Sequence, residues 1–169
     1  MTVCPENDPK AWGSHLPALL YALSKTVGDV LEVGVGHFST PALHNYCLGA
    51  DRNLVSVEDN PEWFTHFRDR YQRFGHAFIS GPYDQSIPFL AKSGSWAVAF
   101  IDNSPGGARR RDDFVSLLPV SKYVIVHDYH LENEDAIKPL LTNVNHSVYT
   151  AYQPPTLIAS LTGSVPILK

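Results

Sequence analysis

The sequence predicts an α/β domain in which a mainly parallel sheet is covered by helices on both faces. Short apolar runs alternate with amphipathic segments along the chain, and this alternation is typical of βαβ units. Two of the runs, 97–101 and 123–126, are almost continuously apolar, as expected of strands that are buried on both faces. The last two runs lie too close together for a helical crossover, so we expect them to form an antiparallel hairpin.

The first elements are indicated by apolar spacing and by glycine and proline signals. Segment 10–26 has the apolar spacing of a helix, and Gly28 follows it as a stop signal. Pro17 allows a break within that helix. A strand at 29–34 comes next. Thr40-Pro41 then opens a helix that extends to about residue 49, because proline is favoured at the first helical position.

The rest of the chain repeats the same alternation. A strand at 53–58 is followed by Asn60-Pro61, which opens a helix with an aromatic face. Each later apolar run is separated from the next by an amphipathic or turn-forming segment. We expect strands at 76–80, 96–102, 123–128, 147–152 and 156–162, and helices at 84–92, 108–118 and 133–143.

Length and composition limit the class of protein. The 169 residues suit one domain, with 1–28 as an N-terminal helical segment and 29–169 as the core. A content of 44% hydrophobic and 18% charged residues is that of a globular protein. The formal net charge of −4 argues against nucleic acids and anionic membranes as partners. The basic cluster 109–111 is followed by two acids, and we expect a solvated helix start or a local contact there rather than a nucleic-acid patch.

The sequence also carries no signal for a membrane or for secretion. No apolar run approaches the roughly 20 residues that span a bilayer. The first residues lack the basic and apolar regions of a signal peptide. Cys4 and Cys47 are too few for a disulfide framework. We therefore expect a cytoplasmic protein.

A glycine-containing turn follows the first predicted strand. Segment 29–41 runs from apolar residues through Glu32, Gly34 and Gly36 into the predicted helix. Glycine lets a ligand approach the backbone closely because it carries no Cβ. Glu58 ends the second strand 22 residues after Gly36, close to the spacing of about 20 in nucleotide-binding units. Because its carboxylate can accept hydrogen bonds from both ribose hydroxyls, the two strands predict a nucleoside pocket.

The residues of the turn indicate which nucleoside is bound. A dinucleotide fingerprint would place its third glycine at position 39, where this chain has Ser39. Glu32 would repel a pyrophosphate but suits a ligand that carries an ammonium group. The turn therefore argues against NAD. The alternative is an α/β protein in which the glycine turn only packs tightly.

The pattern Glu32-x-Gly34-x-Gly36, with Glu58 downstream, resembles the first motif of the class I S-adenosylmethionine-dependent methyltransferases. The resemblance covers about residues 10–165. It implies a single-domain, Rossmann-like seven-stranded sheet in the order 3-2-1-4-5-7-6, with strand seven antiparallel. It also implies S-adenosylmethionine as the cofactor. In that family the acid corresponding to Glu32 lies near the methionine amino group, and the acid corresponding to Glu58 holds the ribose.

Further cofactor contacts are expected after the second and third strands. Asp59 directly follows Glu58 and is expected to join it in cofactor binding. Segment 80–90 is similar to the segment after the third strand of catechol O-methyltransferase-type enzymes, which brackets the adenine. That resemblance implies that Tyr83 and Asp84 are adenine neighbours, with Asp84 accepting from the exocyclic amine. Asp84 is equally a residue type found in turns and at helix starts.

Two acids, Asp102 and Asp128, end neighbouring strands at the edge where open parallel sheets bind ligands. We expect both to be catalytic, and Asp102 also to contact the cofactor. In catechol-type and macrolide-sugar O-methyltransferases, acids at these places bind a divalent cation. The resemblance thus implies Mg²⁺ on Asp102 and Asp128, where it would lower the pKa of an acceptor hydroxyl. The catechol-type pattern has Asn after the second acid, however, whereas this chain has Tyr129, a poor magnesium ligand.

Histidines near the same edge offer a general base in the absence of a metal, because they titrate near neutral pH. His130 lies beyond the predicted end of the fifth strand and is the preferred candidate. His127 precedes Asp128 within that strand, so side-chain alternation predicts that only one of the two faces the site. His15 and His37 are further candidates.

These features predict an S-adenosylmethionine-dependent methyltransferase that methylates an oxygen of a small-molecule acceptor. The alternatives are a non-catalytic S-adenosylmethionine-binding or structural protein with the same fold, and a nicotinamide-dependent enzyme. We also expect a homodimer, because Trp12, Leu16 and residues 165–168 would form an apolar patch of the kind that marks contact sites. Packing of these residues onto the chain's own sheet is the alternative to a dimer.

Overall fold

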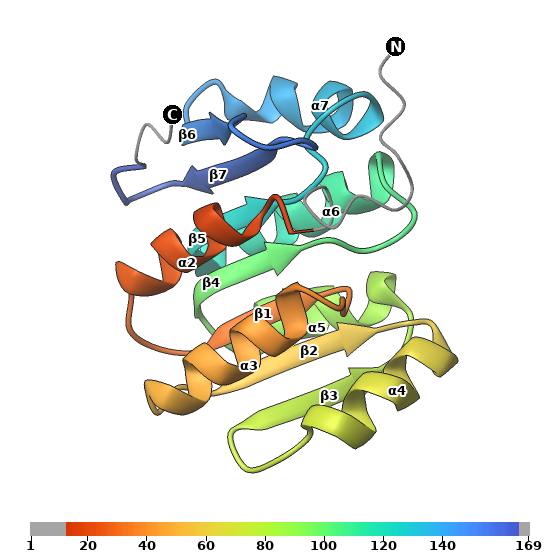
Figure 1. The fold of residues 1–169 in the computed structure, drawn as a ribbon. Coiled ribbons are helices and arrows are strands. Elements are labelled where there is room, and N and C mark those ends of the chain that lie inside the picture. Colours follow the sequence, from red (N-terminus) through yellow and green to blue (C-terminus); the bar gives the residue numbers. More distant parts are fainter. Residues whose placement is uncertain (1–12, 166–169) are drawn as a thin grey trace.

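A computed structural model describes residues 13–165, which form a seven-stranded sheet in the order β3-β2-β1-β4-β5-β7-β6 (Figure 1). β7 is antiparallel to both of its neighbours, and the other neighbouring pairs are parallel. This confirms the predicted strand order and the single antiparallel strand. The strands are β1 (Val30–Val33), β2 (Leu54–Glu58), β3 (His76–Ser80), β4 (Trp96–Ile101), β5 (Ser121–Val126), β6 (Asn145–Tyr149) and β7 (Thr156–Ser160).

Helices cover both faces of the sheet (Figure 1). One face carries α2 (Leu16–Ser24), α3 (Ser39–Gly49) and α4 (Pro61–Tyr71). The other carries α5 (Tyr83–Ser93), α6 (Ala108–Leu117) and α7 (Glu132–Ile137), with 3₁₀ turns at Leu118–Val120 and Lys138–Leu141. Between residues 13 and 165, no helix is long and apolar enough to cross a membrane.

The core consists of two apolar layers, one on each side of the sheet. Leu31 and Val33 pack into the layer under α5–α7, whereas Val30 packs into the layer under α2 and α3. β4 and β5 divide their side chains between the two layers in the same alternating way, because successive residues of a strand point to opposite faces. Both faces of these strands are therefore buried, and this explains the continuous apolar runs at 97–101 and 123–126.

Several element boundaries differ from those predicted. Pro17 lies in the first turn of α2, where proline is tolerated because its missing N–H has no partner in that turn, so it starts the helix and does not break it. The described part of the chain begins after residues 10–12, so the predicted start of this helix cannot be compared. Asn60 caps α4 by accepting hydrogen bonds from two backbone amides. β5 ends at Val126 and not at residue 128, with consequences for the site.

Candidate functional site

A cavity of about 630 Å³ opens at the carboxyl ends of β1, β2, β4 and β5. Its volume is within the range of about 300–1,000 Å³ that is usual for small-molecule sites. Parallel sheets bind ligands at this edge because their loops gather there. The lining includes His15, Gly34, Gly36, His37, Glu58, Asp59, Tyr83, Asp102, His127, Asp128 and His130.

The glycine turn after β1 forms one wall of the cavity. Gly34 has a φ of +88°, and a Cβ built there would lie 2.7 Å from the backbone oxygen of Asp102. Glycine is therefore required at this position, both for its backbone conformation and for the close approach of the ends of β1 and β4. The amide of Gly36 donates to Thr40 Oγ1 at 2.9 Å, which ties the turn to the first residues of α3.

Glu32 lies behind this turn and not in the cavity. It is fully buried, and its two carboxyl oxygens accept hydrogen bonds from Thr40 Oγ1 at 2.9 Å and Ser56 Oγ at 2.6 Å. Burial raises its pKa from 4.5 to about 7, outweighing these hydrogen bonds. Glu32 is absent from the cavity lining, and through Thr40 its side chain supports the glycine turn; its direct contact with the cofactor stays a prediction.

Glu58 lies in the cavity wall at the end of β2. Its Oε2 accepts from the amide of Val35 at 3.0 Å, and its Oε1 accepts from the amide of Asn60 at 2.8 Å. Burial raises the pKa of Glu58 more than these backbone hydrogen bonds lower it. The two amides hold the carboxyl group in one orientation, and the second lone pair of each oxygen stays available to a ligand. Asp59 beside it also lines the cavity.

Tyr83 and Asp84, the two residues predicted to lie next to the adenine, point in different directions at the start of α5. Tyr83 is buried and lines the cavity, whereas Asp84 is exposed and lies outside it. Successive residues of a helix point about 100° apart, so the turn that brings Tyr83 inward carries Asp84 outward. The structure therefore retains Tyr83 in the site and corrects the placement of Asp84.

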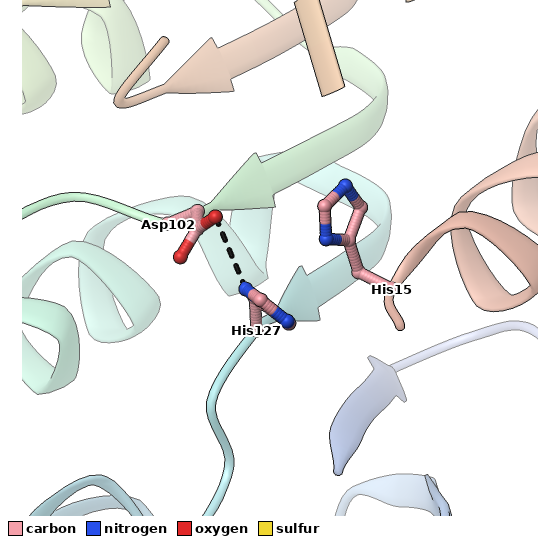
Figure 2. A group of neighbouring side chains, drawn as sticks. All are labelled: His15, Asp102 and His127. Carbon is pink, nitrogen blue, oxygen red and sulfur yellow. Dashed lines mark hydrogen bonds and ion pairs between the residues drawn. The ribbon is translucent and has the colours of Figure 1, made fainter. Parts of the chain in front are cut away.

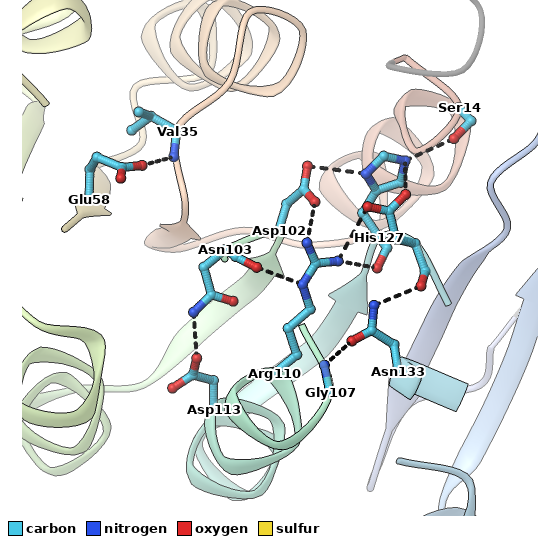
Figure 3. A network of polar contacts seen from close by, with 11 residues as sticks. Ser14, Val35, Glu58, Asp102, Asn103, Gly107, Arg110, Asp113, His127 and Asn133 are labelled. Atoms are coloured by element: carbon cyan, nitrogen blue, oxygen red, sulfur yellow. Dashed lines mark hydrogen bonds and ion pairs between the residues drawn. The ribbon is translucent and has the colours of Figure 1, made fainter. Parts of the chain in front are cut away.

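A buried arginine, Arg110 of α6, pairs with both predicted catalytic acids, and Figure 3 shows it next to one of them, Asp102. Its Nη2 lies 3.1 Å from Asp102 Oδ1, and its Nη1 lies 3.7 Å from Asp128 Oδ2. Only 7% of the Arg110 side chain is exposed. It also donates to the backbone oxygens of Asn103 at 2.8 Å and His127 at 2.7 Å. Arg110 thus joins the ends of β4 and β5 and supplies the positive charge between the acids.

This arrangement does not fit Mg²⁺ bound between Asp102 and Asp128. The guanidinium of Arg110 occupies the place from which one ion would contact both carboxylates. Tyr129 is buried and is not part of the cavity lining, so it supplies no third oxygen. Mg²⁺ needs several oxygen ligands in octahedral geometry, and the residues present do not supply them.

His127 and Asp128 both line the cavity. The prediction that only one of them would face the site is wrong, because β5 ends at Val126 and strand alternation no longer applies beyond it. Asp128 has a positive φ of 52°, and Asn133 Nδ2 donates to its backbone oxygen at 2.9 Å. This turn directs Asp128 Oδ1 back to within 3.6 Å of His127 Nε2.

The hydrogen bonds of His127 define where its protons lie. Ser14 Oγ donates its only proton to the backbone oxygen of Pro154 at 2.8 Å, and it lies 2.9 Å from His127 Nε2. With that proton used, Nε2 is assigned as the donor in the contact with Ser14. Nδ1 then faces Asp102 Oδ2 at 3.1 Å. Burial alone would lower the pKa of His127, but the nearby Asp102 carboxylate outweighs burial and raises it.

The other predicted histidines also reach the cavity. His15, His37 and His130 all line it; His37 and His130 are exposed, whereas His15 is 2% exposed. Burial, assisted by the charge of His127, lowers the pKa of His15 to about 3. The candidate bases thus lie at two depths, with His130 near the opening and His15 next to His127.

Sequence reasoning missed Arg110, because the cluster 109–111 was expected to be a solvated helix start or to make a local contact. The structure corrects this expectation for one of the three arginines. Arg111 is exposed and pairs with Asp112, and Arg109 pairs with Asp113. Helical spacing carried the missing signal: the buried residues of α6 are Arg110, Asp113, Phe114 and Leu117, which is the i, i+3, i+4, i+7 pattern of one helix face.

No model of a known protein family matches the sequence, and no protein of curated function matches it. Solved structures do share its fold. The methyltransferase PaMTH1 of Podospora anserina, bound to S-adenosylhomocysteine (SAH), has a TM-score of 0.67 at 12% identity, over 86% of this chain and 76% of that one. An O-methyltransferase from Bacillus cereus in complex with SAH gives 0.67 at 15% identity, over 94% and 84%.

An rRNA methylase from Streptococcus thermophilus has a TM-score of 0.62 at 8% identity, over 88% of this chain and 95% of that one. These identities are too low to carry an activity across, because one fold hosts many functions. The likeness shows the fold alone: the chain shares its Rossmann-like seven-stranded sheet with these methyltransferase structures.

Proposed function

We propose that this chain is an S-adenosylmethionine-dependent methyltransferase that transfers a methyl group to an oxygen of a small-molecule acceptor. One observation carries the proposal. A single cavity at the carboxyl edge of a methyltransferase-type sheet brings together the glycine turn, Glu58 and the two acids Asp102 and Asp128. The glycine turn offers backbone that a ligand can approach closely, and Glu58 offers a fixed carboxylate for a ribose. The two acids offer polar groups where an acceptor would bind.

The contacts around Glu58 support binding of an adenosyl group. Two backbone amides hold its carboxyl in place, so it can accept from ribose hydroxyls without first being ordered. Tyr83 adds a buried aromatic side chain to the same cavity. The glycine turn lies between this region and Asp102, which places the methionine part of the cofactor toward the acids in our proposal.

Methyl transfer asks mainly for alignment, since the sulfonium is already activated. The acceptor oxygen forms a bond to the methyl carbon while the carbon–sulfur bond breaks, and the electron pair stays on sulfur to give SAH. The acceptor proton must leave as well. We assign its removal to His130 or Asp128, which line the cavity, because both nitrogens of His127 are already engaged.

A small acceptor fits the charges better than a nucleic acid does. The chain has a formal net charge of −4. The three consecutive arginines of α6 each pair with a carboxylate, and one of them is buried. Nucleic-acid substrates need cationic side chains free to contact phosphates. This is why we propose a small molecule, although one protein with the same fold is an rRNA methylase.

Calorimetry on the purified chain tests the proposal. We expect S-adenosylmethionine and SAH to bind and NAD not to bind. Glu58→Ala should weaken SAH binding by about 1.5–3 kcal/mol, the scale of hydrogen bonds to a charged group. The matched control is Glu134→Ala, because Glu134 pairs with Lys138 on the surface; its affinity should equal that of the wild type.

Three results would contradict the proposal. NAD binding without SAH binding would indicate a nicotinamide-dependent protein. Unchanged SAH affinity in a folded Glu58→Ala variant would remove the ribose assignment. If SAH binds and no acceptor becomes methylated across a panel of hydroxylated small molecules, the chain is a non-catalytic binder.

A further inference from the structure

Three side chains meet at one wall of the cavity, and two of them, His15 and His127, have no role in the chemistry described above (Figure 2). His15 immediately precedes α2, Asp102 follows β4 and His127 follows β5. One potential ligand atom from each lies within 4.8 Å of the other two. The three residues are far apart in the sequence, so the fold itself brings them together.

The pair His127 and Asp102 requires a positive species between its facing atoms. Because Ser14 Oγ donates to Pro154, His127 Nε2 carries a proton. A neutral imidazole would then present the lone pair of Nδ1 to Asp102 Oδ2, 3.1 Å away. Two lone pairs at that distance repel each other. Either a second proton or a metal ion must therefore occupy the space between the two atoms.

His15 also lacks a partner. Its ring is 2% exposed, and neither ring nitrogen has a hydrogen-bond partner among residues 13–165. A buried polar group without a partner costs about 1–3 kcal/mol, and a bound ion is one of the recognised explanations for such a group. The centroid of the His15 ring lies 4.5 Å from that of His127, which places the unused nitrogens beside the His127–Asp102 pair.

We propose that His15, Asp102 and His127 bind one divalent transition-metal ion of the class that includes Zn²⁺, Co²⁺ and Fe²⁺. Two imidazole nitrogens and one carboxylate oxygen are the donor set that these ions prefer, whereas Mg²⁺ prefers oxygen alone. Donors in a tetrahedral zinc site lie about 3.3 Å apart, and the His127–Asp102 distance of 3.1 Å matches this spacing. His15 needs to approach by at most about 1.5 Å to complete the set.

The surrounding contacts are those that metal ligands require. A ligating histidine donates its other N–H to an oxygen, and a ligating carboxylate is itself hydrogen-bonded. His127 Nε2 meets the Ser14 hydroxyl, and the second oxygen of Asp102 is held by Arg110. Arg110 therefore excludes Mg²⁺ from the space between the two acids and orients one of them toward the histidines.

Three protein ligands would leave one coordination position of the ion open, and all three residues line the cavity. A hydroxyl bound there would lose its proton more readily, because the ion stabilises the alkoxide. This role in methyl transfer rests on the proposed function. Binding of the ion does not, and it can be measured without S-adenosylmethionine.

The test titrates chelator-treated, desalted protein with ZnCl₂ and with CoCl₂ by calorimetry, and records the visible spectrum of the Co²⁺ form. We expect one ion per chain and a Co²⁺ spectrum typical of nitrogen and oxygen ligands. His15→Phe keeps an aromatic ring next to Phe100 and should weaken binding by more than about 100-fold, beyond the range of about 10–100-fold for outer-shell changes. Ser14→Ala should fall within that range.

His146→Ala is the matched control, because His146 is an exposed histidine of β6; it should bind as the wild type does. Equal metal affinity in the wild type and a folded His15→Phe variant would place the ion elsewhere and overturn the proposal. Absence of binding to the wild type would also overturn it and leave a proton on His127 Nδ1. SAH binding to the metal-free protein is recorded separately, so failure of the metal site and failure of the proposed function give different results.

Discussion

Buried Arg110 and partly buried Asp102 form an ion pair at the carboxyl edge of the sheet, with 3.1 Å between Nη2 and Oδ1. The same guanidinium donates to the backbone oxygens of Asn103 and His127. One side chain thereby fixes the ends of two neighbouring strands and the orientation of one of the acids they carry. The pair has a structural role in the site, because it holds the strand ends that form part of the cavity wall.

Removal of Arg110 should therefore destabilise the protein. Arg110→Ala leaves the Asp102 carboxylate without its buried partner, and we expect the free energy of unfolding to fall by about 3 kcal/mol. Arg111→Ala, one residue further along the same helix, removes an exposed pair with Asp112 and should change it by less than about 0.5 kcal/mol. Urea unfolding of the three proteins measures both values. Equal stability of the two variants would contradict the structural role of Arg110.

Gly34→Ala should damage both the fold and cofactor binding. The substitution forces a side chain into a positive φ and brings its Cβ 2.7 Å from the backbone oxygen of Asp102. We expect a loss of at least about 2 kcal/mol of stability. Gly49→Ala is the control, because a Cβ there meets nothing within 4 Å; at the end of α3 it should be neutral or stabilising by up to about 1 kcal/mol. Thermal unfolding with and without SAH separates the two effects.

Glu32 should make stability depend on pH. Burial raises its pKa from 4.5 to about 7 in the folded state, so between these values the unfolded chain loses a proton that the folded chain keeps. Its contribution is therefore most favourable below pH 4.5, falls as the pH rises to 7, and is constant above that. The total change is about 3 kcal/mol.

Glu32→Gln isolates this contribution, because the amide cannot titrate and can still hydrogen-bond to Thr40 and Ser56. The measured quantity is the unfolding free energy of the wild type minus that of the variant, at several pH values from 5 to 8. We expect this difference to decrease up to about pH 7 and then to level off. A difference that stays constant or increases would show that Glu32 is ionised throughout.

Self-association is the fourth prediction. Trp12 and residues 166–168 of the expected contact patch lie outside the described residues, whereas Leu16 is partly buried and Val165 packs against the core. We propose that the expected contact patch pairs two chains about a two-fold axis. Sedimentation at micromolar concentration should give twice the mass of one chain. The mass of a single chain would rule the dimer out.

The order of the sheet could be predicted because each strand is marked locally. β4 and β5 are apolar throughout, so their burial on both faces is visible in the sequence. The short segment between β6 and β7 permits only a hairpin. The ends of the strands were less predictable: β5 stops at Val126, where His127 bonds to Ser14 and Asp102, and those partners come from distant parts of the chain.

Site residues could be predicted where the residue type and its place after a strand allow only one role. Gly34, Gly36, Glu58 and Tyr83 line the cavity as expected. Glu32 and Asp84 do not, because helix and strand geometry turn their side chains away from it. A motif gives the spacing of residues along the chain, whereas their direction depends on neighbouring elements.

Arg110 shows why the burial of a charged residue is hard to predict from the sequence. Its charge indicated solvent, and its partners Asp102 and Asp128 lie 8 and 18 residues away, each just after a different strand. Burial of an arginine is favourable only when such partners surround it. Those partners become visible only when the strands are assembled.

The crystal structure of the chain in complex with SAH tests the central claim most directly. The account predicts SAH in the cavity, with its ribose hydroxyls within hydrogen-bond distance of Glu58 and its sulfur on the side of Asp102. The adenine should lie against Tyr83. SAH bound outside this cavity, or bound within it with the ribose away from Glu58, would contradict the account.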